Sequence, residues 1–153
     1  MRIFIFLHVA IMFTAVAMTI GVPTLLWSIA KSGDVPSIRR TFAVARPFIK
    51  AIPPLFGLGA VVGIVAIFTN GFDPFQPFLL IAYVLFILAT VVGIVYTDPW
   101  FMSVTKLSAE SPDEAPSTEL SAALHDPRLN WIVWFDRVII LAFIFDMVIK
   151  PFS

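Results

Sequence analysis

The chain has 153 residues, of which 59% are hydrophobic and only 13% are charged. Soluble globular proteins usually carry about 25% charged residues, so this composition excludes a chain that is solvated on all sides. The formal net charge is zero, which gives no indication of nucleic-acid binding. Cysteine is absent, which excludes disulfides, thiolate chemistry and cysteine-ligated metals.

The first apolar segment extends from about residue 3 to residue 29. Arg2 precedes it, and Ala15-Val16-Ala17 resembles a signal-peptide cleavage site. Because the apolar run continues well past that site, we expect a retained first transmembrane helix. Its length of roughly 40 Å exceeds the roughly 30 Å hydrocarbon core, so we expect a tilt, or a bend at Gly21 and Pro23.

Three more apolar segments follow, at about residues 51–69, 78–97 and 130–149. Together the four predict an all-α integral membrane bundle of four transmembrane helices, forming one domain over residues 1–153. Residues 98–129 then form a loop. Within it, Asp98-Pro99 predicts a short helix lying on the membrane surface. Polar residues 108–123 predict a mobile loop with a short helix, with a regulatory or docking loop as the alternative. Asp126-Pro127 predicts the start of the last helix.

Positive charge is concentrated between the first two segments, at Lys31, Arg39, Arg40, Arg46 and Lys50, whereas the next connection, at 70–77, has none. The positive-inside rule places the first connection in the cytoplasm. We therefore expect the loop at 98–129 to be cytoplasmic and both termini to face outward, in a bacterial inner membrane.

Small residues recur at helical spacing, which allows close packing of helices in lipid. On the first helix, Ala10, Thr14, Ala17 and Gly21 form one face, and His8, Met12, Ala15 and Thr19 form nearly the opposite face. Gly59 and Gly63 lie on the second helix, and Ala89 and Gly93 on the third. Packing within the bundle is the simpler interpretation, and a partner subunit against the second face of the first helix is the alternative.

His8 is the most notable single residue, because ionisable residues within membranes are costly and often functional. It could ligate a haem b iron, or be a hydrogen-bonded interfacial histidine. His125 lies in the cytoplasmic loop, so the topology excludes an intramolecular bis-histidine site. Asp146 lies at a depth similar to that of His8, and could either contact His8 or pair at the surface with Lys150, one turn away.

Asp136 and Arg137 lie inside the last apolar segment, and neighbouring side chains point about 100° apart on a helix, so they are poorly placed to pair. Asp136 therefore needs another cation, such as Lys50 or Arg46, and Tyr96 and Thr97 could join that cluster. A structural ion pair and a site for protons or an anionic substrate are the two interpretations.

Several of these features resemble an uncharacterised bacterial family of small four-helix integral membrane proteins. The resemblance is carried by Phe6-Leu7-His8-Val9, by Arg39-Arg40, and by the ending Asp146-Met147-Val148-Ile149-Lys150-Pro151. The layout is similar to that of copper-resistance D-type proteins and of the membrane-type protoporphyrinogen oxidase, which binds haem through a first-helix histidine. This resemblance implies the four-helix fold and places His8 where that histidine would be.

Two functions remain open at this point. HExxH, P-loop, GxSxG and paired zinc-ligand motifs are absent, so no metal site is expected. We expect a non-catalytic accessory or structural subunit that packs in the bilayer with other membrane subunits or with itself, and does not bind nucleic acid. The alternative is a haem-binding membrane redox protein or oxidase with His8 as axial ligand.

Overall fold

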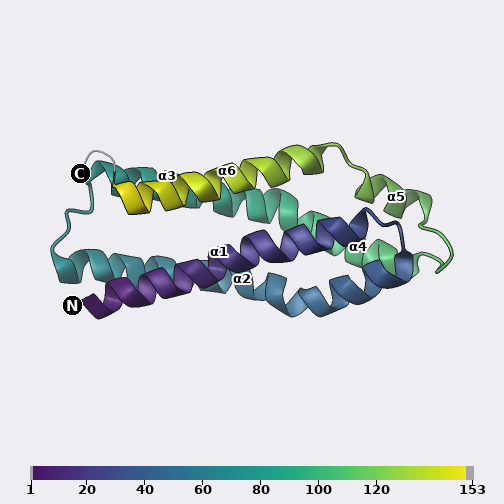
Figure 1. The fold of residues 1–153 in the computed structure, drawn as a ribbon, viewed down its shortest axis with the longest axis horizontal. Helices are drawn as coiled ribbons and strands as arrows, with labels where there is room; N and C mark the ends of the chain where they lie inside the picture. The colour runs from purple at the N-terminus through teal and green to yellow at the C-terminus, as the bar shows by residue number, and fades with distance from the viewer. Residues whose placement is uncertain (1, 151–153) are drawn as a thin grey trace.

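The computed structural model describes residues 2–150, and this part of the chain is helical apart from short connections. Its elements are α1 (Arg2–Ala30), α2 (Val35–Asn70), α3 (Pro77–Val92), the π-helical segment η1 (Gly93–Thr97), α4 (Asp98–Glu110), α5 (Thr118–Leu124) and α6 (Arg128–Ile149). α1 packs beside α2 and α3 beside α6, and α4 and α5 lie at the opposite end from the start of α1 (Figure 1). The all-α prediction is confirmed.

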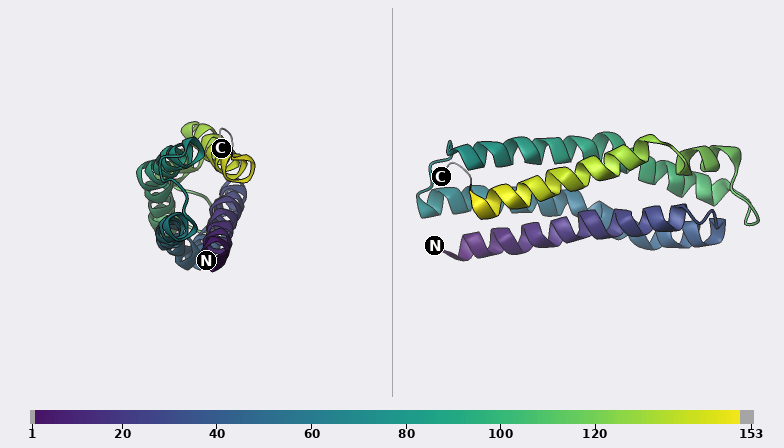
Figure 2. Two further views of the ribbon diagram at one scale, coloured as in Figure 1. Left: turned by 90° about the vertical axis from the view of Figure 1, so that its left-hand side faces the viewer. Right: turned by 45° about the horizontal axis from the view of Figure 1, so that its top comes forward.

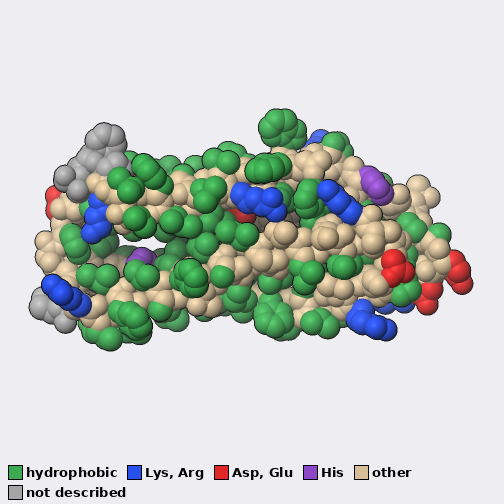
Figure 3. All heavy atoms as spheres, viewed as in Figure 1, with side chains coloured by type: hydrophobic (Ala, Val, Ile, Leu, Met, Phe, Trp, Pro, Cys, Tyr) green, Lys and Arg blue, Asp and Glu red, His purple; other side chains and the backbone are tan. Residues whose placement is uncertain are grey.

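Three helical stretches are long and apolar enough to cross a membrane: α1, α2 and the continuous stretch Pro77–Glu110. α6 is not among them, because its 22 residues include Asp136, Arg137 and Asp146. Apolar side chains cover much of the long face of the molecule (Figure 3). Water would solvate such a surface poorly, so the three stretches are compatible with a membrane protein.

α2 begins at Val35, well before the expected start near residue 51. The Asp34 carboxylate caps the helix by accepting a hydrogen bond from the Ser37 N–H at 3.2 Å, and a proline occupies the first turn. Most of the residues predicted as a basic connection therefore form a helical extension at the start of α2. Its apolar positions Ile38, Phe42, Ala45 and Ile49 are buried.

The helix α3 continues through η1 into α4 without a break, because the residues at both junctions have right-handed helical backbone angles. This differs from the separate helix expected to begin at Asp98-Pro99. Pro99 has no N–H and its ring crowds the carbonyl one turn back. The wider π-turn, in which the Asp98 N–H bonds the Gly93 carbonyl, accommodates this proline and keeps the helix going.

A helical cap, which we define as residues 35–50 of α2 together with α4 and α5, contains the largest buried core of the molecule. The Phe42 ring stacks on Phe101 at 5.5 Å between centroids and meets Trp100 edge-on at 5.8 Å. Val104 and Leu120 are fully buried beside them. The apolar face of α4 therefore packs on protein, and the prediction that it lies on the membrane surface is wrong.

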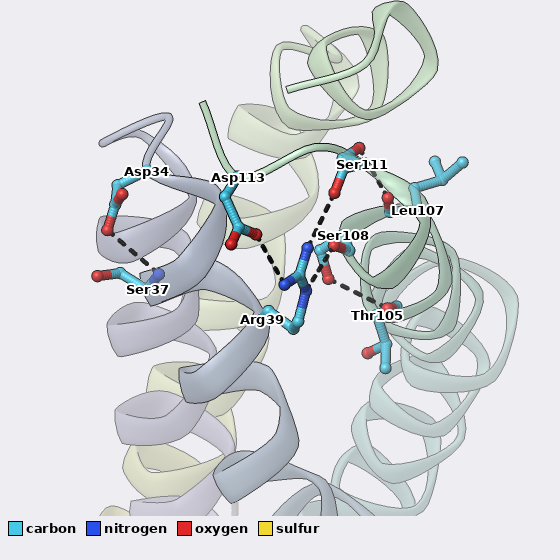
Figure 4. A network of polar contacts seen from close by, with 8 residues as sticks. All are labelled: Asp34, Ser37, Arg39, Thr105, Leu107, Ser108, Ser111 and Asp113. Carbon is cyan, nitrogen blue, oxygen red and sulfur yellow. Dashed lines mark hydrogen bonds and ion pairs between the residues drawn. The ribbon is translucent and has the colours of Figure 1, made fainter. Parts of the chain in front are cut away.

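Arg39 fixes the segment between α4 and α5 against α2 (Figure 4). Its Nε donates to the Ser108 carbonyl, its Nη2 to the Ser111 carbonyl and its Nη1 to the Asp113 carboxylate, each at 2.9 Å. Trp100 Nε1 also donates to the Ala123 carbonyl at 3.1 Å. The expected mobile stretch is therefore held by side-chain hydrogen bonds to backbone carbonyls.

Replacing Arg39 with Gln should lower the free energy of unfolding by about 1 to 3 kcal/mol, because two buried carbonyls lose a charged donor. Asp113→Asn, which removes only a partly exposed ion pair, should cost less than about 1 kcal/mol. Denaturant titration in mixed micelles, followed by circular dichroism, would measure both. Equal effects of the two substitutions would show that the carbonyl contacts contribute nothing.

Candidate functional site: a cavity between the two helix pairs

A cavity of about 310 Å³ lies between the α1–α2 pair and the α3–α6 pair. The two pairs pack mainly within themselves, and the view along the bundle shows the four long helices arranged in a ring (Figure 2). Large apolar side chains form most of the wall, and they include Trp27, Phe56, Phe86, Trp100 and Phe143. The cavity therefore has the apolar, aromatic lining that is typical of small-molecule sites.

Interruptions of the regular helix occur at the level of this cavity. Pro23 of α1 and Pro53 of α2 both line it, and neither has an N–H to donate to the preceding turn. Gly93, Ile94, Tyr96 and Thr97 of the π-helical segment line it from the other pair. Such interruptions bend helices and re-aim side chains, and here they lie in the walls of the cavity.

Charged side chains from two helices line the same cavity: Asp98 from α4, and Asp136 and Arg137 from α6. Tyr96 and Thr97 also line it, so this part of the expected polar cluster is brought together. Lys50 and Arg46, the cations expected to pair with Asp136, are exposed and do not line the cavity. In the described part of the chain, the ion pair found is Arg39–Asp113.

Arg137 links α6 to α1: its Nη2 donates a hydrogen bond to the Thr24 hydroxyl at 3.0 Å. Its guanidinium carbon also lies 5.6 Å from the Trp134 ring centroid. The sequence interpretation missed Thr24, because a single threonine in the apolar helix α1 carries no signal of its own. It also missed Asp98 as a cavity residue, because Asp-Pro was taken as a helix start, although the apolar run before it was uninterrupted.

His8 packs into a notch on α2 formed by two glycines. Its Nδ1 lies 2.8 Å from the Gly59 carbonyl oxygen, close enough for Nδ1–H to donate. A Cβ on Gly63 would lie 2.8 Å from both Nδ1 and Cε1 of His8, and one on Gly59 would meet the Met12 sulfur. Gly59 and Gly63 therefore serve close packing of α1 on α2, as small residues do in lipid.

Gly63→Ala should lower the free energy of unfolding by about 1 to 3 kcal/mol, because the added methyl overlaps the imidazole ring of His8. In a His8→Ala background the same change should be neutral or slightly stabilising, since the ring is gone and alanine favours helix. A double-mutant cycle by thermal unfolding in detergent checks this. Additive effects of the two substitutions would contradict the packing of His8 on Gly63.

Asp146 is only 2% exposed, and neither carboxylate oxygen has a hydrogen-bond partner among residues 2–150. The Lys150 ammonium lies instead over the rings of Phe72 and Phe78, at 5.2 and 5.6 Å. Asp146 therefore forms neither the surface pair with Lys150 nor the contact with His8 that the sequence allowed. It is buried where α6 packs beside α3, in a shallow groove lined by Leu85 and Ala142.

The other predicted packing residues separate into two groups. Ala10, Thr14, Ala17 and Gly21 are all exposed, on the side of α1 away from α2, and a Cβ on Gly21 would meet nothing within 4 Å. Ala89 and Gly93 line the cavity, and Gly93 likewise has open space around it. Ala89 and Gly93 therefore do not make a close helix contact in the bundle. The exposed face of α1 does not pack within the described bundle either, which leaves its alternative interpretation, contact with a partner subunit.

Comparison with known proteins finds no matching family model, curated protein or solved structure. Among the described residues, no group of three or more His, Cys, Asp or Glu side chains is placed to hold a metal ion. Three features of the molecule therefore bear on its function: the outward small-residue face of α1, the cavity with its charged residues, and His8, which packs on α2.

Proposed function

We propose that this chain is a bacterial inner-membrane protein in which α6 is a fourth span, with both termini outside. α6 is about 33 Å long at 1.5 Å per residue, enough for a roughly 30 Å hydrocarbon core, and it packs along α3. The helical cap carries Arg39, Arg40 and Arg46, which favours the cytoplasm for that end. Arg137 lies in the half of α6 that begins at the cap end, and its long side chain donates a hydrogen bond to the Thr24 hydroxyl of α1.

We further propose that the protein is a non-catalytic membrane subunit that holds a second transmembrane helix, of another subunit or of a second copy, against α1. The observation that carries this proposal is the outward face formed by Ala10, Thr14, Ala17 and Gly21. Four small side chains in register let another helix backbone approach closely, and the opposite face of α1 already packs on α2.

Gly21→Leu and Gly21→Ala test this proposal as a matched pair, because only leucine fills the outward face. Membranes from the native host would be solubilised in digitonin, and the size of the particle containing this chain would be measured by native mass spectrometry. We expect an assembly larger than the single chain in the wild type and in Gly21→Ala, and its loss in Gly21→Leu. A single-chain particle in the wild type would reject the proposal.

A haem-binding redox protein is the second candidate, and it is favoured by the bond from His8 Nδ1 to the Gly59 carbonyl. That bond selects the tautomer in which Nε2 keeps its lone pair, which is the arrangement of a metal-ligating histidine. Nearer the end where α1 begins, the space-filling view shows an opening between the two helix pairs (Figure 3).

The dithionite-reduced minus air-oxidised absorption spectrum of the purified protein tests this candidate, with haem supplied during expression. Haem bands that persist in His125→Ala and vanish in His8→Ala would support it, because His125 directly follows α5 and lies within hydrogen-bonding distance of the Ser121 carbonyl, far from His8. A flat spectrum of the wild type would reject it and leave His8 as a packing residue.

A further inference from the structure

We propose that the cavity between the two helix pairs binds a small amphipathic organic cation, such as an aromatic quaternary ammonium. The positive group would lie at the carboxylates of Asp98 and Asp136, and the apolar part would lie between the aromatic walls. The proposal is independent of what covers the outward face of α1.

The charges that line the cavity favour a cation. Two carboxylates and one guanidinium line it, so their formal sum is negative. Arg137 directs its hydrogen bond to the neutral Thr24 hydroxyl and its guanidinium toward the Trp134 ring. Arg137 forms no ion pair with either carboxylate in the described chain, so neither carboxylate is neutralised by direct contact with it.

The aromatic walls of the cavity suit the apolar part of such a ligand. Trp27, Phe56 and Phe86 contribute aromatic surface, and quaternary ammonium groups bind to aromatic faces through cation–π attraction. The volume of about 310 Å³ is at the lower end of the range of roughly 300 to 1,000 Å³ for small-molecule pockets. A ligand with one aromatic ring and a trimethylammonium group is of suitable size.

The test is calorimetric titration of the full chain in lipid nanodiscs with three probes of nearly equal size. Phenyltrimethylammonium carries the positive charge, tert-butylbenzene is its neutral isostere, and benzenesulfonate is an anion. We expect the cation to bind at least about tenfold more tightly than either of the others, because attraction to a carboxylate is strong in a site of low dielectric constant.

Variants locate the binding and separate it from folding. Asp136→Asn and Asp98→Asn should each weaken cation binding by about tenfold, whereas Arg137→Gln should strengthen it by removing a repulsive charge. Glu119→Gln, which removes an exposed negative charge in the cap, should change nothing. A gain of affinity in Arg137→Gln cannot arise from misfolding, so the proposal stays testable even if an aspartate variant fails to fold.

Three results would overturn the proposal. Equal affinity for tert-butylbenzene would show that the cavity is only apolar, and tighter binding of benzenesulfonate would show that Arg137 determines its preference. Cation binding that is unchanged in both aspartate variants would place the probe elsewhere, in the lipid or on the surface.

Discussion

Phe42→Ala is expected to lower the free energy of unfolding by about 3 to 5 kcal/mol, the cost of truncating a fully buried aromatic side chain. Phe42 has no exposed surface, and its ring lies against both Phe101 and Trp100. It therefore joins α2 to α4, and its loss leaves a void at the centre of the helical cap. Denaturant titration in mixed micelles, followed by circular dichroism, measures this change.

Phe68→Ala is the matched control, because it removes the same side chain from the same helix where that side chain is 69% exposed. It should have a small effect in detergent, since an exposed side chain leaves no cavity when it is truncated. Similar effects of the two substitutions would show that the cap does not pack around Phe42.

Asp146→Leu is expected to raise the free energy of unfolding, by about 1 to 4 kcal/mol, the gain seen when buried ionic groups are replaced by apolar ones. The Asp146 carboxylate is buried between apolar neighbours and accepts no hydrogen bond within residues 2–150. Leucine has a similar shape and needs no hydrogen-bond partner. Thermal unfolding in a fixed detergent compares it with the wild type.

Asp146→Asn serves as the comparison, because it removes the charge but keeps two polar atoms that still need partners. Asp146→Asn should raise the free energy of unfolding by less than Asp146→Leu does. If both substitutions destabilise the protein, the prediction is wrong, and the carboxylate has a partner that stabilises it.

The sequence alone determined the helical class and the apolar character of this protein. Long uninterrupted runs of apolar residues can satisfy their backbone hydrogen bonds in lipid only as helices, so composition and periodicity were sufficient. The N-cap signal of α2, Asp34 followed by Pro36, was also visible in the sequence. The positive charges that follow it suggested a connection instead of a helix. Charge sets which face of a helix meets water, and it does not end the helix.

The proline positions show where local rules fail. Asp98-Pro99 suggested a separate helix start, whereas α3 reaches α4 there through a π-turn. In the same way, α2 continues through Pro53 and Pro54 without a break. Where water cannot reach the backbone, leaving its groups unpaired costs more than a distorted turn, so a continuous helix is favoured. Neither cost can be judged from a few neighbouring residues, because both depend on whether the turn is exposed to water.

The environment of His8 and the cavity also could not be predicted from local sequence. His8 was notable by itself, but its partner, the carbonyl of Gly59, is 51 positions away and has no side chain to mark it. The cavity joins Thr24, Asp98 and Asp136 from three helices, and only the packing of the pairs brings them together. Residue spacing determines which face of one helix a side chain occupies, whereas the contacts across helices determine what that side chain can bind.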